Sequence, residues 1–145
     1  MIIDIKKLND KAVLPTRGSS EAAGWDLYSN NEEVIQVEAH STVMIGTGLA
    51  MAIPSGYFGA VFARSGLATK QGLRPANCVG VIDSDYRGEV IVALHNDSNE
   101  VRTINPKERI AQLVVMPYLS VEFNEKEALD ETLRGSGGFG STGAK

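Results

Sequence analysis

The chain alternates short apolar runs with turn residues along most of its length. Runs rich in Val, Ile, Tyr and Phe are separated by Gly, Pro, Asn and Asp, a pattern that indicates short β-strands. We expect strands within IIDI, VIQVEA, TVMIGTGLAMAI, YFGAVFA, VGVI, EVIVALHN, RTI and RIAQLVVM. Only GLATKQG and EKEALDETL are compatible with short helical turns. The pattern therefore predicts an all-β domain, built as a sandwich, a jelly roll or a small barrel.

The composition changes after Phe123, which divides the chain into two parts. We expect a β domain over residues 1–123, followed by a charged connector and a glycine-rich C-terminal arm over 124–145. The arm places one aromatic residue, Phe139, among glycines, where no packed core can form. Glycine-rich chain brings N–H groups close to an anion, and hydroxyl and guanidinium side chains in the arm are further donors. The arm is either a flexible terminus or a lid that orders over a ligand.

Overall composition narrows the classes of function. The 145 residues are 43% hydrophobic and 22% charged, as in an ordinary soluble domain, and no stretch has the length of a membrane span. We therefore expect a cytoplasmic protein that binds no membrane. A net charge of −4 argues against general binding to nucleic acid, so an anionic ligand needs local arginines or a metal. The single cysteine, Cys78, fits a reducing compartment and is expected to be a small buried residue.

The segment GVIDSDYRGEV at residues 80–90 is the strongest candidate for chemistry. Strand patterns flank a tight polar turn, which predicts a β-hairpin. Asp83 is a carboxylate at a strand end that is able to take a proton from water, and Tyr86 offers a flat ring for a sugar. Alternatively, Asp83 and Asp85 only accept hydrogen bonds from amides of the turn. Arg87 fits a solvated turn residue and has no assigned role.

Three further segments carry isolated polar groups. In ARSGLA, Arg64 and Ser65 open a possible helical turn, which is either a phosphate site or a capped turn. In RIAQLV, the amide of Gln112 faces either a phosphate or nearby backbone. In AGWDLYS, Asp26 either orients a water in a Mg²⁺ shell or caps the adjacent turn.

Together with the arm, these segments resemble the five motifs of the trimeric dUTP pyrophosphatases (dUTPases). The motifs stand in the family's order as AGWDLYS, ARSGLA, GVIDSDYRGEV, RIAQLV and RGSGGFGSTG, and Asn77 is placed as expected ahead of the third. The departures are Trp25, where tyrosine is usual, and Ala63, where glycine or proline is common. Neither position is expected to carry chemistry.

The resemblance implies a jelly-roll homotrimer whose shared active sites hydrolyse dUTP to dUMP and pyrophosphate, which removes dUTP from the nucleotide pool and supplies dUMP for dTMP synthesis. It implies Asp83 as the base that activates water, Mg²⁺ across the phosphates, and Asp26 holding that metal through water. The resemblance implies three kinds of substrate contact. The backbone of the third motif, with Asn77 and Tyr86, would bind the nucleoside, a second set of residues would bind the phosphates, and the tail would close over the ligand as a lid. The residues are Arg64, Ser65, Gly66, Asn77, Val81, Tyr86, Gln112, Arg134, Phe139, Gly140, Ser141 and Thr142.

Two rivals remain. The dCTP deaminases share the Ile-Asp turn, but their catalytic glutamate falls at Ala93 and their usual tryptophan at Tyr86, and they lack a tail of this kind. The second rival is a nucleotide-occupied binding module that contacts a regulatory protein. A turnover assay separates such a module from an enzyme.

Overall fold

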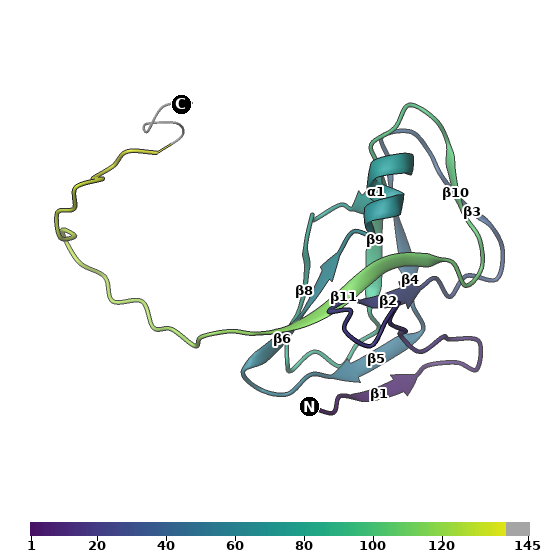
Figure 1. Cartoon of the computed structure of the whole chain (residues 1–145), viewed down its shortest axis with the longest axis horizontal. Helices are drawn as coiled ribbons and strands as arrows, with labels where there is room; N and C mark the ends of the chain where they lie inside the picture. Colours follow the sequence, from purple (N-terminus) through teal and green to yellow (C-terminus); the bar gives the residue numbers. More distant parts are fainter. Residues whose placement is uncertain (139–145) are drawn as a thin grey trace.

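The computed structural model describes residues 1–138 of the chain. Its strands are β1 (Asp4–Lys7), β2 (Trp25–Tyr28), β3 (Ile35–Val37), β4 (Thr42–Gly46), β5 (Leu49–Ala52), β6 (Tyr57–Phe62), β7 (Leu73–Pro75), β8 (Gly80–Ile82), β9 (Ile91–Asn96), β10 (Arg102–Ile104) and β11 (Arg109–Pro117). One short helix, α1 (Ser65–Gln71), follows β6. Figure 1 shows these strands wrapped around a common interior. The helix contacts β7, the strand that follows it.

All strand pairs are antiparallel, and most join distant parts of the sequence. One sheet has the order β2-β11-β6-β8 and a second has the order β4-β9-β7, while β1-β5 and β10-β3 are separate pairs. The last strand, β11, thus lies between β2 and β6 in the larger sheet. This arrangement confirms the predicted all-β, jelly-roll-like fold.

The core is formed by inward side chains of the two larger sheets together with residues from β3, β5, β10 and α1. β9 alternates strictly, with Val92 and Leu94 at 1% and 0% exposure, as expected for a strand with one face buried. Each such aliphatic side chain contributes about 1.5–3 kcal/mol to the free energy of folding. The buried amide of Asn96 donates to the carbonyl oxygens of Val37 and Glu100 at 2.9 and 2.7 Å. The other buried polar side chains, Ser29 and Thr47, donate to the carbonyls of Asn105 and Val90, so the largely apolar interior has its buried polar residues hydrogen-bonded.

The predicted β-hairpin around Asp83 does not form. β8 pairs with β6, whereas β9 pairs with β4 and β7, so the strands on either side of the turn belong to different sheets. The amide of Val90 donates instead to the carbonyl of Leu49 on β5 at 2.8 Å, so the chain leaves β6 and β8 before it enters β9. Residues 83–88, called the Asp83 turn below, therefore bridge two sheets.

The arm leaves the domain at the end of β11. From Tyr118 to Gly138 the chain has no helix or strand, and Figure 1 shows it extending far from the body. The helical turn expected in EKEALDETL is absent, since a short exposed helix has no packing to stabilise it. Apolar side chains along this segment after β11 face solvent, with Leu119, Phe123 and Leu129 at 87%, 96% and 85% exposure. The division of the chain near residue 123 stays a prediction.

Within the described residues, no helix has the length and apolar character needed to cross a membrane.

Candidate active site

Asp26, Arg64 and Arg109 form an ionic group, called the arginine cluster below. Asp26 lies on β2 opposite Gln112 of β11, and Gln112 lies opposite Phe62 at the end of β6. The chain leaving β6 therefore brings Arg64 back over Asp26. Nε of Arg64 donates to Oδ1 of Asp26 at 2.7 Å, and Nη1 of Arg109 donates to Oδ2 at 3.2 Å.

The charge balance of the arginine cluster favours an anion. The Asp26 side chain is only 16% exposed and carries one negative charge, whereas the two guanidinium groups carry two positive charges. Guanidinium groups keep further N–H donors after binding one carboxylate. Arg64 and Arg109 are therefore able to bind phosphate oxygens while Asp26 holds them in place.

Ser65 and Gly66 lie directly beside Arg64 on the surface. Arg64 precedes α1 in an extended conformation, with φ of −77° and ψ of 130°, and makes no side-chain cap. The predicted helical turn is therefore present. The alternative interpretation, a turn capped by a side chain, is not, because no side chain caps this helix. Ser65 and Gly66 are exposed, and the space where a Cβ of Gly66 would project is open. Leu67 is buried and fixes the helix to the core.

The amide of Gln112 has a backbone partner. Its Nε2 donates to the carbonyl of Ala63 at 2.8 Å, so the predicted bond to nearby backbone exists. A Cβ on Gly24 would lie 2.5 Å from Oε1 of Gln112, so a larger residue there would displace the amide from its present position. One N–H of the amide remains for a ligand, because the group carries two hydrogens.

The Asp83 turn carries the second group of candidate residues. Asp83 is exposed and Tyr86 is 45% exposed, while the amide of Tyr86 donates to the carbonyl of Asp83 at 3.2 Å. Nη1 of Arg87 donates to the carbonyls of Ser84 and Tyr86 at 2.7 and 2.9 Å. Arg87 thus binds the turn's own backbone.

Asn77 and Val81 lie beside this turn. Val81 is 62% exposed on β8, and Nδ2 of Asn77 lies 3.4 Å from where a Cβ of Gly80 would stand, at the start of that strand. Cys78 is exposed, so the expectation of a buried cysteine is wrong. The cause is a tight turn in which Cys78 has a φ of +62° and its amide donates to the carbonyl of Pro75.

The two groups lie at opposite edges of one sheet. In the order β2-β11-β6-β8, the arginine cluster is at the β2 edge and the Asp83 turn follows the β8 edge. With strands about 4.8 Å apart, β2 and β8 are separated by about 14 Å. They are also offset along the sheet, because Ile82 pairs with Gly59 whereas Asp26 is level with Phe62. One chain therefore does not bring Asp83 and Arg64 together.

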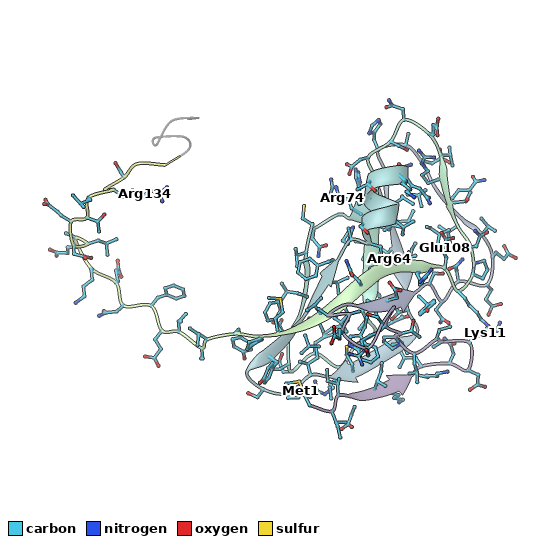
Figure 2. All side chains as sticks on the ribbon, viewed as in Figure 1. Met1, Lys11, Arg64, Arg74, Glu108 and Arg134 are labelled. Carbon is cyan, nitrogen blue, oxygen red and sulfur yellow. The ribbon has the colours of Figure 1, made fainter. Side chains whose placement is uncertain are left out.

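The arm adds Arg134, whose Nε donates to the carbonyl of Gly137 at 2.8 Å. Figure 2 shows Arg134 on the arm, far from the labelled Arg64. The other predicted lid residues lie outside the described residues: Phe139, Gly140, Ser141 and Thr142.

Sequence reasoning did not single out Arg109 or Gly24. Arg109 has a recognisable signal, a charged residue at the start of an otherwise apolar strand. Gly24 has none, because its role depends on the position of Gln112 across the sheet.

The fold and the two groups define an all-β protein with a candidate site for a polyanionic ligand. Comparison with known proteins then specifies the family. The dUTPase family profile matches residues 10–143, and the chain belongs to the dUTPase family.

Relatives of this chain span nearly its whole length. A deoxyuridine 5'-triphosphate nucleotidohydrolase of Nautilia profundicola is 49% identical and covers 99% of both chains. One of Oryza sativa is 47% identical and covers 98% of this chain and 81% of its own. Among solved structures, the G164S mutant of the Staphylococcus bacteriophage 80alpha dUTPase with dUpNHpp has a TM-score of 0.85, 28% identity and 99% coverage of both chains.

Proposed function

We propose that the protein is a cytoplasmic enzyme that hydrolyses dUTP to dUMP and pyrophosphate, which removes dUTP and supplies dUMP for dTMP synthesis. Family membership supports this proposal, as do relatives that are dUTP nucleotidohydrolases over the full length of the chain. The observation that carries it is that one chain contains both a positively charged arginine cluster and, separately, a turn with an exposed carboxylate and an exposed aromatic ring.

The Asp83 turn and its neighbours would bind the nucleoside. Backbone groups around Val81, with Asn77, would pair with the edge of uracil, while the ring of Tyr86 packs against deoxyribose. Uracil presents N3–H beside O4 and cytosine presents the reverse, so a fixed backbone edge leaves two mismatched contacts with cytosine. At about 1–3 kcal/mol for each unsatisfied group, selection by several powers of ten is reachable.

The arginine cluster would bind the phosphates. Arg64 keeps free N–H donors, Ser65 and Gly66 offer a hydroxyl and open backbone beside it, and Gln112 keeps one amide hydrogen. Arg134 and the predicted lid residues would close over the ligand and exclude water.

Asp83 would act as general base. Its carboxylate takes a proton from water, the water oxygen forms a bond to the α-phosphorus, and the bond from that phosphorus to the bridging oxygen breaks. The electron pair leaves with pyrophosphate, so no external co-reactant is needed. The guanidinium of Arg64 stabilises the charge that develops on the phosphates.

Magnesium is the metal that we propose. Among residues 1–138, no three His, Cys, Asp or Glu side chains gather as a metal site. Both oxygens of Asp26 accept hydrogen bonds from arginines, but each keeps a second lone pair that fits a metal-bound water. Asp26 would therefore hold Mg²⁺ through water. When bound, the ion neutralises charge on the phosphates and the leaving group.

We further propose a homotrimer with active sites shared between chains. The two groups of site residues are about 14 Å apart across the sheet, so they need a second chain to meet. The exposed apolar residues of the arm also fit contact with another chain, as do Met44 and Ile91 on the outer face of the second sheet, at 68% and 47% exposure.

The test is to incubate the protein and Mg²⁺ with each deoxynucleoside triphosphate and to measure pyrophosphate. We expect release from dUTP alone. In ¹⁸O-labelled water the label should enter dUMP, because attack is at the α-phosphorus. Label in pyrophosphate would refute that mechanism, and the absence of turnover would favour a binding module.

A further inference from the structure

The Asp83 turn is attached to the body of the protein at its C-terminal end, by backbone bonds of Val90 and by the side chain of Glu89. The hydrogen bonds of Tyr86 N and Arg87 Nη1 run within the turn itself and do not fix its position. Oε1 of Glu89, in contrast, accepts from the amide of Gly48 at 2.7 Å. Gly48 lies in the connection between β4 and β5, so this bond ties the turn to a different part of the chain.

Two glycines, Gly46 and Gly48, lie near this carboxylate and affect its binding in different ways. A Cβ on Gly46 would clash with Oε1 of Glu89, so the carboxylate occupies space that any other residue would fill. Gly48 has a φ of +67°, and a Cβ there would lie 2.5 Å from Nδ2 of Asn30. The missing side chain at Gly46 leaves room for the Glu89 carboxylate, while the left-handed backbone at Gly48 belongs to the turn that presents the amide this carboxylate binds.

Glu89 also holds the ring of Tyr86. The hydroxyl of Tyr86 donates to the backbone carbonyl of Glu89 at 3.0 Å. A Cβ on Gly88 would lie 2.4 Å from that hydroxyl oxygen, so the ring lies directly against the backbone of Gly88. Glu89 thus contacts the ring through its main chain and the domain through its side chain.

We propose that Glu89 is a positioning residue that sets the preference for deoxyribose over ribose by fixing the ring of Tyr86. A ring that excludes a 2′-hydroxyl has to stay within a fraction of an ångström of its place, and the Glu89 carboxylate is the side-chain link nearest to the ring that holds it there, in addition to the backbone bonds of Val90. The link needs a hydrogen-bond acceptor and not a charge, since its partner is a backbone amide. This inference rests on the proposed function, in which Tyr86 packs against the sugar.

The test compares kcat/KM for dUTP and UTP in the full-length wild type, Glu89→Ala and Glu89→Gln. We expect Glu89→Ala to lower the dUTP/UTP ratio about 3- to 30-fold, because a looser ring admits ribose. Glu89→Gln keeps an acceptor oxygen and should stay within about twofold of the wild-type ratio. Glu38→Ala is the matched control, since Glu38 is exposed and only its backbone carbonyl accepts a bond among the described residues.

Tyr86→Phe tests the route through the ring. It keeps the ring but removes the bond to the Glu89 carbonyl, so it should lower the same ratio. In the double variant with Glu89→Ala, the two effects should not multiply, because both act on one ring. If Glu89→Ala proves insoluble, Tyr86→Phe carries the test alone.

The outcomes separate this inference from the proposed function. A wild-type protein with no turnover of dUTP would refute the function itself. If the wild type is active and prefers dUTP, but the dUTP/UTP ratio of kcat/KM is the same in Glu89→Ala or in Tyr86→Phe, only the role of Glu89 is overturned. A merely structural role would lower the unfolding temperature of Glu89→Ala while leaving the ratio as it is.

Discussion

Nε of Arg64 lies 2.7 Å from Oδ1 of Asp26, across a gap of 38 residues in sequence. Both side chains are largely covered, at 26% and 16% exposure, and Arg109 contacts the other oxygen of Asp26. Asp26 therefore orients the two guanidinium groups to which we assign the phosphates. Asp26 is therefore expected to contribute separately to the free energy of unfolding and to the binding of Mg²⁺.

Asp26→Asn should lower stability and weaken the use of Mg²⁺. The variant keeps the shape of the side chain but removes the charge that the arginines share, which should cost about 1–3 kcal/mol of the free energy of unfolding. The concentration of Mg²⁺ at half-maximal activity should rise, because a neutral amide holds a metal-bound water less well. Chemical denaturation and a Mg²⁺ titration measure both, with Asp10→Asn, an exposed position, as control.

Unchanged stability in Asp26→Asn would contradict the role of the arginine cluster. Unchanged Mg²⁺ dependence alongside lowered stability would contradict only the metal role of Asp26.

Asp83→Asn should abolish most turnover while leaving the fold and binding intact. Asp83 is exposed in the turn, so the substitution removes no buried contact, whereas an amide cannot take a proton from water. We expect kcat to fall by about 10²–10⁴, with little change in the binding of a non-hydrolysable dUTP analogue. A variant that retains more than a tenth of wild-type kcat would show that another group activates the water.

Most of the fold follows from local patterns in the sequence. The predicted runs overlap all the strands except β2 and β7, although IIDI covers only the first two residues of β1 and RIAQLVVM stops one residue short of the end of β11. They also join β4 and β5 into one run. β2 was missed because Asp26 interrupts its apolar residues, and β7 because it is short and ends in Pro75. The break between β4 and β5 depends on the positive φ of Gly48.

The site was predicted as a set of residue types, and the contacts among them were not. Arg109 and Asp26 are 83 residues apart in sequence, and only the pairing of β11 with β2 brings them together. The same holds for Glu89, whose carboxylate meets Gly48 across 41 residues. A local pattern also does not show that Asp83 and Arg64 lie at opposite edges of one sheet. These features depend on strand order, which periodicity does not specify.

Asp97→Asn should reduce stability near neutral pH and have less effect in acid. The guanidinium of Arg74 binds both carboxylate oxygens, at 2.6 and 3.0 Å, and holds the pKa of Asp97 below its ordinary value. Stability from this pair is present above the ordinary pKa and is lost as pH falls through the lowered one. Unfolding temperatures of the variant and the wild type should therefore converge on acidification below about pH 4. A difference that stays constant with pH would show that the ion pair is not the cause.

The arm should be needed for chemistry and dispensable for folding. A chain ending at Leu133 loses the predicted lid. It loses no hydrogen bond to the β domain among the described residues, because Arg134 bonds only to Gly137 within the removed segment. We expect an unchanged unfolding temperature and oligomeric state, with much slower turnover of dUTP. A large fall in the unfolding temperature would make the removed segment structural.

The last prediction concerns which chains build one active site. Two inactive proteins are prepared, Asp83→Asn with its arm intact and a chain ending at Leu133 with Asp83 intact, and they are unfolded and refolded together in equal amounts. If Asp83 and the lid of one site come from different chains, each site has about one chance in two of receiving each working part. Activity should then return to about a quarter of the wild-type value. If one chain supplied both parts, no mixture could combine them, and preparations with proven mixed trimers would stay as inactive as the parents.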